Sequence, residues 1–140
     1  MFDILNEEKK YNNQRYLFDS DIIIDILKND KYLINYVKKL KEESSTLFYS
    51  PVSKAEIFAG AFKDEFDKIN LFFNQFTCIQ ITDSIGEQAG LFLNQYRKSC
   101  NIGLGDALIA ATAFYYGFYL ITRNTKHYPM EEVKIIEPMM

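Results

Sequence analysis

The sequence predicts an α/β fold in three layers, an α/β/α sandwich whose mainly parallel sheet lies between two layers of helices. Short apolar runs with the length of buried strands alternate along the chain with longer segments whose apolar residues recur at helical spacing. No internal repeat or low-complexity segment interrupts this alternation. Where strands and helices alternate, the strands usually run parallel and the helices cover both faces of the sheet.

Length and composition indicate one soluble domain. The chain has 140 residues, of which 48% are hydrophobic and 25% charged, enough for a core without disulfides or structural metals. No apolar run could span a bilayer and the start lacks a secretory pattern, so we expect a cytoplasmic protein without membrane contact. The net charge of −3 argues against a non-specific nucleic-acid coat. Cys78 and Cys100 are interpreted as reduced core thiols.

The beginning of the chain is set apart from the rest by its polarity. Residues 1–15 are mostly polar and are interpreted as an N-terminal extension, either docked or loose. A small apolar anchor within it comprises Phe2, Ile4 and Leu5. Residues 16–140 are expected to form the folded domain, because the alternation of strands and helices begins there.

The first two predicted strands lead into helices with recognisable starts. Residues 16–18 form a buried strand followed by an acidic pair, and a helix starts from Asp21. Asp30 suits the N-cap of the next helix. The second strand, residues 46–50, is followed by Ser53-Lys54-Ala55-Glu56, which has the S-x-x-E form of a capping box.

The second half of the chain repeats the alternation. Its predicted elements are helices at residues 64–76, 83–98 and 106–116 and strands at residues 77–81, 118–121 and 133–136. Asp106 opens an almost wholly apolar helix, and Gly117 closes it at a position where a left-handed C-cap is favourable.

Polar side chains reach the carboxyl ends of the predicted strands by independent routes. They are Asp19 after the first strand, Glu56 in the helix after the second, Asp106 at the start of the apolar helix and Asn124 after the fourth strand, with Asp21 as a neighbour. Ligands of open parallel sheets bind beyond these strand ends. Each residue also has a simpler interpretation, as a helix cap, a dipole partner or a turn residue. Asp19 fits that interpretation least, because it directly follows a buried strand.

Several carboxylates at one edge of a sheet would repel one another unless a cation compensates them. Mg²⁺ or Mn²⁺ fits a site with only oxygen ligands, and the chain offers neither a Cys pair nor a His pair for Zn²⁺. Such a site suits phosphoryl chemistry, because the cation lowers the pKa of a water and stabilises charge on phosphate oxygens.

The single histidine, His127, is interpreted as a surface residue. No Ser–His pair is evident, which argues against a nucleophilic triad. Together with Arg123 and Lys126, His127 forms a small basic cluster that could contact a phosphate backbone.

Four motifs carry a resemblance to a known family. They are Leu17-Phe18-Asp19-Ser20-Asp21, Ser53-x-x-Glu56, Gly103-Leu104-Gly105-Asp106-Ala107-Leu108-Ile109-Ala110-Ala111-Thr112-Ala113 and Leu120-Ile121-Thr122-Arg123-Asn124. In their order and spacing they resemble the PIN domain, and more closely the VapC-type toxins of bacterial toxin–antitoxin pairs. The match covers about residues 16–137, and the first 15 residues lie outside it.

The resemblance implies a metal-dependent endoribonuclease, the toxin of a type II toxin–antitoxin system. Asp19 and Asp106 would hold Mg²⁺ directly, and Glu56 would bind it through water or orient the attacking water. Asn124 would stand at a fourth position that is acidic in many relatives, and it would fix a water or the substrate. An Asn there weakens the case for a second metal. Cleavage of RNA would leave a 5′-phosphate.

The resemblance also implies neighbours of the site and partners of the protein. Ser20 and Thr122 match hydroxyl positions that line the site. Asp21 stands where relatives often have Asn, so we interpret it as a helix cap that also tunes the charge of the site. The partners implied are a second copy of the chain in a homodimer and a cognate antitoxin whose C-terminal segment covers the groove.

Two other interpretations are open on the sequence alone. Asp19-x-Asp21 after a strand also resembles the nucleophile motif of haloacid-dehalogenase-type phosphatases, but Ala110 stands where their later acid is needed. Alternatively, the chain is a catalytically inactive PIN-like binding module whose acidic residues only cap helices.

Overall fold

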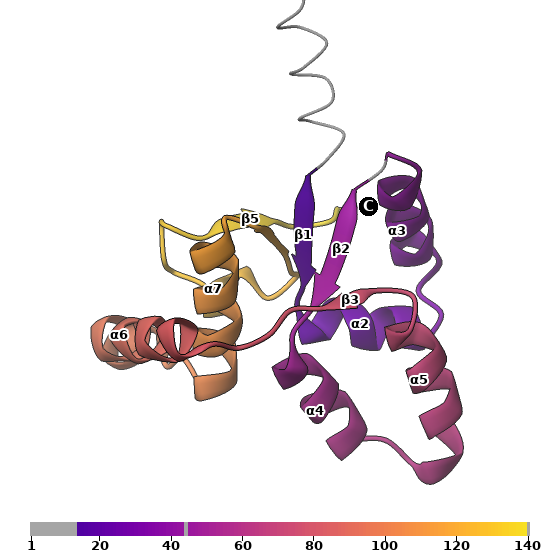
Figure 1. Ribbon diagram of the computed structural model, residues 1–140, viewed down its shortest axis with the longest axis horizontal. Helices are drawn as coiled ribbons and strands as arrows, with labels where there is room; N and C mark the ends of the chain where they lie inside the picture. Colours follow the sequence, from indigo (N-terminus) through magenta and orange to yellow (C-terminus); the bar gives the residue numbers. More distant parts are fainter. Residues whose placement is uncertain (1–13, 44, 140) are drawn as a thin grey trace, which may run out of the picture.

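The computed structural model describes residues 14–43 and 45–139. Five strands form one sheet, in the order β3-β2-β1-β4-β5, and every pair of neighbours is parallel. The strands are β1 (Arg15–Phe18), β2 (Thr46–Tyr49), β3 (Thr77–Cys78), β4 (Tyr119–Ile121) and β5 (Lys134–Ile136). The predicted parallel sheet is therefore confirmed, and β1 lies at its centre (Figure 1).

Helices cover both faces of the sheet, as the three-layer prediction requires (Figure 1). The first group consists of α2 (Ser20–Leu27), α3 (Lys31–Glu42), α4 (Pro51–Ala59) and α5 (Phe66–Phe73), with a 3₁₀ turn at Lys63–Glu65 before α5. The second group consists of α6 (Asp83–Cys100) and α7 (Leu104–Tyr116). Another 3₁₀ turn, Thr125–His127, follows β4.

The alternation of side chains along the central strand separates two hydrophobic cores. Leu17 is fully buried against α6 and α7, whereas the next residue, Phe18, is fully buried among α2, α3, α4 and α5. Successive side chains of a strand point to opposite faces, so one short strand supplies both cores. Leu120 and Ile121 of β4 repeat the pattern. This packing fixes the carboxyl ends of β1 and β4 side by side, where the main-chain N–H of Asp19 donates to the Ile121 carbonyl at 2.9 Å.

The starts of three helices differ from the sequence predictions. The N-cap of α2 is Asp19 rather than Asp21, because the Asp19 carboxylate already accepts the N–H of Ser20. The N-cap of α4 is Ser50, so α4 starts before Ser53 and the predicted capping box does not form. Helix α7 starts two residues early, at Leu104, which puts Asp106 in its first turn. In α2 and α4, a cap nearer to the strand satisfies one of the first free N–H groups, whereas the N-cap of α7, Gly103, offers no side chain for this.

Other predicted elements are shorter than expected or lie elsewhere. The third strand has two residues instead of five, and the helix expected at residues 64–76 divides into a 3₁₀ turn and α5. Both cysteines are free, as predicted, but Cys78 is exposed and Cys100 half-buried, so their placement in the core was wrong. Arg15 already belongs to β1, and the apolar anchor proposed near the N-terminus lies outside the described residues. Among the described helices, none combines the length and hydrophobicity needed to cross a bilayer.

Gly117 allows a direct test of the predicted C-cap of α7. Its φ is +69°, in the left-handed region, and a Cβ added there would meet no atom within 4 Å. Gly117→Ala should therefore lower the free energy of unfolding by about 1–2 kcal/mol through backbone strain alone. The matched control is Gly90→Ala inside α6, which also has open space for a Cβ and should stabilise by about 0.5–1 kcal/mol. Urea denaturation of both variants would measure this, and equal effects would contradict the C-cap.

Candidate functional site

Asp19 is a buried carboxylate at the end of the central strand, and it is only 4% exposed. Its Oδ1 accepts the main-chain N–H of Ser20 at 2.7 Å, and its Oδ2 accepts the Thr122 hydroxyl at 2.8 Å. A buried polar group needs such partners, since leaving it unsatisfied costs free energy. The two bonds come from the two segments that leave β1 and β4. They hold the Asp19 carboxylate in one orientation before any ligand binds.

Glu56 is joined to the Asp19 region by a pair of serine hydroxyls. The Ser20 hydroxyl lies 2.8 Å from the Ser53 hydroxyl and 3.3 Å from Oε1 of Glu56. Ser53 is fully buried, so it acts as a link between α2 and α4 and not as the helix cap that its motif predicted. Gly105 of α7 approaches from the other side: a Cβ there would lie 3.4 Å from Glu56 Oε1. The glycine thus lets α7 come close to α4.

Asp106 occupies the first turn of α7 and is about one-third exposed, with 30% of its side chain accessible. Oδ2 of Asp106 lies 3.3 Å from Nδ1 of His127, and Oδ1 accepts the Tyr128 hydroxyl at 3.5 Å. His127 is half-exposed, in line with the prediction of a surface residue, but its ring borders the acidic site. Tyr128 is buried, and nothing in the sequence around it indicated that it would meet the carboxylates.

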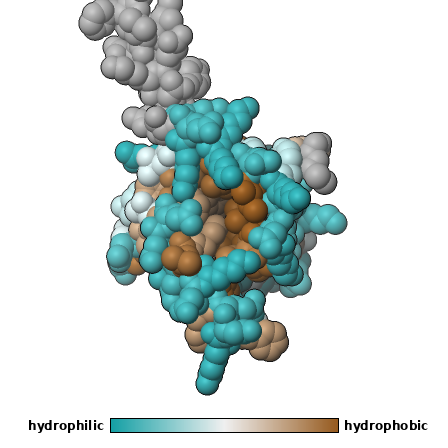
Figure 2. Space-filling view, turned by 90° about the vertical axis from the view of Figure 1, so that its right-hand side faces the viewer, coloured by the Kyte–Doolittle hydropathy of each residue, from teal (hydrophilic) through white to brown (hydrophobic). Residues whose placement is uncertain are grey.

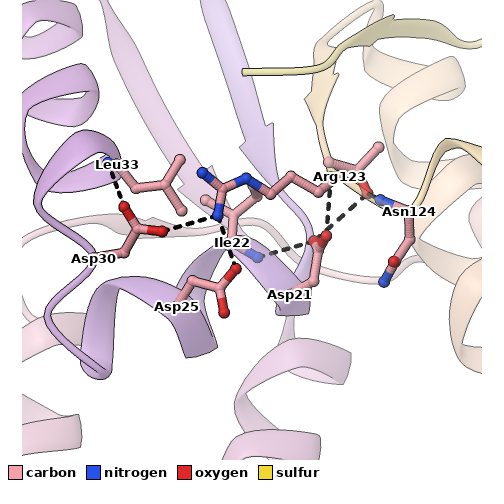
Figure 3. A network of polar contacts seen from close by, with 8 residues as sticks. Asp21, Ile22, Asp25, Asp30, Leu33, Arg123 and Asn124 are labelled. Atoms are coloured by element: carbon pink, nitrogen blue, oxygen red, sulfur yellow. Dashed lines mark hydrogen bonds and ion pairs between the residues drawn. The ribbon is translucent and has the colours of Figure 1, made fainter. Parts of the chain in front are cut away.

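The loop after β4 closes the site on its remaining side. The Thr122 hydroxyl, which donates to Asp19, also accepts the N–H of Asn124 at 3.0 Å. Asp21 Oδ2 accepts the main-chain N–H of Arg123 at 2.9 Å, and Figure 3 shows Asp21 facing this loop. Asp21 therefore joins α2 to the loop, and Asn124 lies exposed at the edge of the site.

The three predicted basic residues do not form one cluster. The guanidinium of Arg123 contacts Asp25 at 3.0 Å and Asp30 at 2.9 Å, away from Asn124 (Figure 3). Lys126 is exposed, and His127 lies against Asp106. Pairing Arg123 with Asp25 and Asp30 depends on contacts across more than ninety residues of sequence, so local motifs gave no signal for it.

Burial and the charge of Asp19 raise the pKa values of three neighbouring acids. Burial, and then the charge of Asp19, raises the pKa of Asp21 to about 6. The pKa of Glu56 is raised by burial and by the charges of Asp19 and Asp106, although the Ser20 hydroxyl opposes the shift. The pKa of Asp106 is raised by burial and by Asp19, while His127 works against the shift. The negative charges of these acids are thus not fully balanced by positively charged side chains of the protein.

The donor chemistry of the site fits Mg²⁺ or Mn²⁺. In the described chain, no three Asp, Glu, His or Cys side chains are arranged as a ready ligand set for one ion. Mg²⁺ does not need one, because it commonly binds through one or two carboxylates and keeps several waters. Asp19 and Asp106 can supply those carboxylates, and their mutual repulsion is what a cation would relieve.

An apolar pocket lies next to the acidic site. It measures about 240 Å³ and is lined by α2, α4 and α5. Its apolar wall includes Ile24, Leu27 and Ile57, while Glu56 of the acidic site also lines it. The side of the molecule that carries α3 and α5 is hollowed, with hydrophobic side chains inside and hydrophilic residues around the rim (Figure 2).

The fold and the site can now be compared with known proteins. The family model of the PIN domain matches residues 16–133. Ribonuclease VapC10 of Mycobacterium tuberculosis is 35% identical over 117 residues, covering 83% of this chain and 87% of the relative. Ribonuclease VapC19 of the same organism is 28% identical over 116 residues, covering 81% of this chain and 92% of the relative.

Solved structures show the same fold. VapBC2 from Rickettsia felis, bound to a DNA fragment from its promoter, matches with a TM-score of 0.79 and 21% identity, over 89% of this chain and 98% of that chain. A toxin–antitoxin complex from Klebsiella pneumoniae matches with a TM-score of 0.70 and 26% identity over the same shares. The chain belongs to the PIN domain family. Within that family, it is a relative of the VapC ribonucleases.

The raised pKa of Asp21 predicts how stability depends on pH. Its pKa of about 6 in the folded state lies above the ordinary value of 3.8 for an aspartate, so the folded state binds the proton more tightly than the unfolded state does. This contribution to stability is fully present below pH 4 and is lost as the pH rises through about 6. Asp21→Asn should therefore raise the melting temperature at pH 7.5 by a few degrees, and the gain should shrink towards pH 4.

Differential scanning calorimetry across this pH range would measure the effect. The matched control is Asp83→Asn, an exposed acid in the first turn of α6, which should lose a favourable contact with the helix dipole and be slightly destabilised at pH 7.5. A melting temperature of Asp21→Asn below that of the wild type throughout would contradict the electrostatic account.

Proposed function

We propose that the protein is a metal-dependent endoribonuclease that hydrolyses RNA phosphodiester bonds as the toxin of a type II toxin–antitoxin system in the cytoplasm. The observation that carries the proposal is the pre-oriented Asp19 carboxylate, whose charge helps to raise the pKa values of both Asp106 and Glu56 nearby. The names of the relatives, ribonucleases VapC10 and VapC19, support the same reaction class.

In this proposal Asp19 and Asp106 hold Mg²⁺ or Mn²⁺. When bound there, the cation would lower the pKa of a water and offset negative charge on the phosphate. Glu56, oriented by the Ser20 hydroxyl, accepts the proton of the attacking water. Water attacks phosphorus in line and the P–O3′ bond breaks. The leaving 3′ oxygen takes a proton from solvent water, so the products carry a 5′-phosphate and a 3′-hydroxyl. Thr122 keeps Asp19 in place through its 2.8 Å hydrogen bond.

The exposed edge of the site is proposed to meet the RNA backbone. Asn124 is exposed beside Thr122, where its amide can hold a water or a phosphate oxygen. Lys126 and His127 are exposed in the turn that follows, so both can approach phosphates of the RNA. His127 would do so beside Asp106, which its ring contacts at 3.3 Å. Arg123 differs, since its guanidinium is already paired with two carboxylates.

The partners are proposed from the surfaces next to the site. The apolar pocket of α2, α4 and α5 would take apolar side chains of the antitoxin, whose C-terminal segment would cover the groove beside Glu56. The solved relatives from Rickettsia felis and Klebsiella pneumoniae are a VapBC complex and a toxin–antitoxin complex, which supports this type of partner. For the homodimer, α6 and α7 offer the exposed apolar side chains of Leu91, Phe114 and Tyr115.

The alternatives differ from this proposal in measurable ways. An inactive PIN-like binding module should bind no Mn²⁺ at the acidic site in calorimetry. The phosphatase would need Asp21 as a free acid two residues from the nucleophile, but both oxygens of Asp21 already accept main-chain N–H groups. Membership of the PIN domain family also speaks against the phosphatase.

Asp106→Asn should abolish cleavage and leave the fold intact. The change removes one negative charge from the proposed metal site while keeping the size of the side chain, so cleavage of RNA in Mg²⁺ should fall by at least about 100-fold. Circular dichroism should be unchanged. Asp64→Asn, an exposed acid in the turn before α5, serves as the control and should cleave normally. Undiminished cleavage by Asp106→Asn would rule out this site.

Ile24→Arg should weaken antitoxin binding without affecting RNA cleavage. Ile24 lines the apolar pocket and is 37% exposed, so a charged side chain there would block an apolar partner with little cost to the core. Leu71→Arg is the control, because Leu71 is an exposed apolar residue of α5 outside the pocket lining. Binding would be measured by isothermal titration with the protein encoded by the neighbouring reading frame. Equal binding by the two variants would exclude the pocket.

A further inference from the structure

Arg123 contacts three carboxylates, two in helix α2 and one at the N-cap of α3. Its main-chain N–H donates to Asp21 Oδ2 at 2.9 Å, and its guanidinium reaches Asp25 at 3.0 Å and Asp30 at 2.9 Å. Figure 3 shows the side chain extending from the loop after β4 along α2 to the turn before α3. One residue of the loop thus contacts both α2 and the turn that leads from α2 into α3.

The far end of this connection is itself rigid. Asp30 is the N-cap of α3: while Oδ2 contacts Arg123, Oδ1 accepts the N–H of Leu33 at 3.1 Å. The preceding residue, Asn29, has a left-handed φ of 66°, which turns the chain sharply between α2 and α3. Arg123 therefore binds a carboxylate that is already fixed by the start of a helix.

The near end of the connection leads to Asp19. Thr122, the residue before Arg123, donates to Asp19 Oδ2 at 2.8 Å and accepts the N–H of Asn124 at 3.0 Å. The position of the Thr122 hydroxyl thus depends on the path of loop 122–124. The contacts of Arg123 with Asp21, Asp25 and Asp30 help to fix that path, together with the main-chain N–H of Thr122, which donates to the Ile136 carbonyl at 3.1 Å.

We propose that Arg123 is a positioning residue of the acidic site, which holds loop 122–124 so that Thr122 keeps Asp19 oriented towards a bound cation. The inference rests on the metal site of the proposed function. The alternative is that Arg123 contacts RNA. Two carboxylates surround its single charge, so the local group is net negative and would repel a phosphate.

The partial exposure of the ion pairs makes this role separable from folding. The side chains of Arg123, Asp25 and Asp30 are 26%, 38% and 29% exposed, and pairs of this kind contribute little to stability. The loss of a group that orients a metal ligand, by contrast, typically weakens metal binding about 10- to 100-fold.

Calorimetric titration of the RNA-free protein with Mn²⁺ tests the proposal. Arg123→Gln and the double variant Asp25→Asn/Asp30→Asn should each raise the Mn²⁺ dissociation constant about 10-fold. The triple variant should lose no more Mn²⁺ affinity than either of these variants, since the three residues act through the same set of contacts. Arg123→Lys should restore part of the affinity. The change Asp30→Asn should keep α3 capped, since Asn is also a good N-cap residue. The matched control is Arg97→Gln, which removes an exposed charge from α6 and should leave the Mn²⁺ dissociation constant unchanged.

A second measurement separates positioning from RNA contact. In the Asp106→Asn background, RNA binding should be the same with and without Arg123→Gln. Weaker RNA binding on Arg123→Gln, but not on Asp25→Asn/Asp30→Asn, would overturn the proposal in favour of a phosphate contact. Unchanged Mn²⁺ affinity in the Arg123→Gln variant would overturn it as well.

The proposed function can fail independently. If the wild type binds Mn²⁺ but does not cleave RNA, the ribonuclease proposal fails, and the role of Arg123 is still decided by the Mn²⁺ titrations. If the wild type binds no Mn²⁺, the metal site itself is wrong, and the inference built on it is overturned.

Discussion

The structure around the acidic site depends on burying one carboxylate at the end of the central strand. Asp19 is 4% exposed, so both of its oxygens need partners within the protein. One partner is the first N–H of α2, which makes Asp19 the cap of that helix, and the other is Thr122 at the end of β4. A single side chain thus couples the start of α2 to the neighbouring strand, and the parallel pairing of β1 with β4 makes this geometry available.

A second constraint is the repulsion among the acids that gather around Asp19. The protein answers it locally with neutral donors: the hydroxyls of Ser20 and Thr122, the N–H of Arg123 and the phenol of Tyr128. Such donors orient carboxylates but add no positive charge, and the pKa values of Asp21, Glu56 and Asp106 therefore stay raised. The fold tolerates this electrostatic cost, which is the usual sign of a site arranged for a ligand rather than for stability.

The sequence predicted the parallel three-layer fold because alternating apolar runs and helical periodicity are local signals. It also predicted that Asp19, Glu56 and Asp106 would approach one edge, since strand ends converge in parallel sheets. It did not predict which side chains would form hydrogen bonds or ion pairs with one another. Asp21 was interpreted as a helix cap because the helix was expected to start there. The helix starts at Ser20 instead, and Asp19 is its N-cap. The bond between Ser20 and Ser53 and the pairs of Arg123 form only when distant segments pack together.

The pocket and the acidic site share Glu56, and this shared wall has a chemical consequence. Glu56 is exposed at the edge of the pocket, and the loss of water contact on the side that faces the protein is the largest cause of its raised pKa. A partner chain seated against Ile24, Leu27 and Ile57 would remove more water from Glu56 and raise its pKa further. The carboxyl group would then hold its proton and could no longer accept one from water. In the proposed reaction, occupation of the apolar pocket would thus make Glu56 a weaker acceptor of the proton from water, even without contact to Asp19 or Asp106.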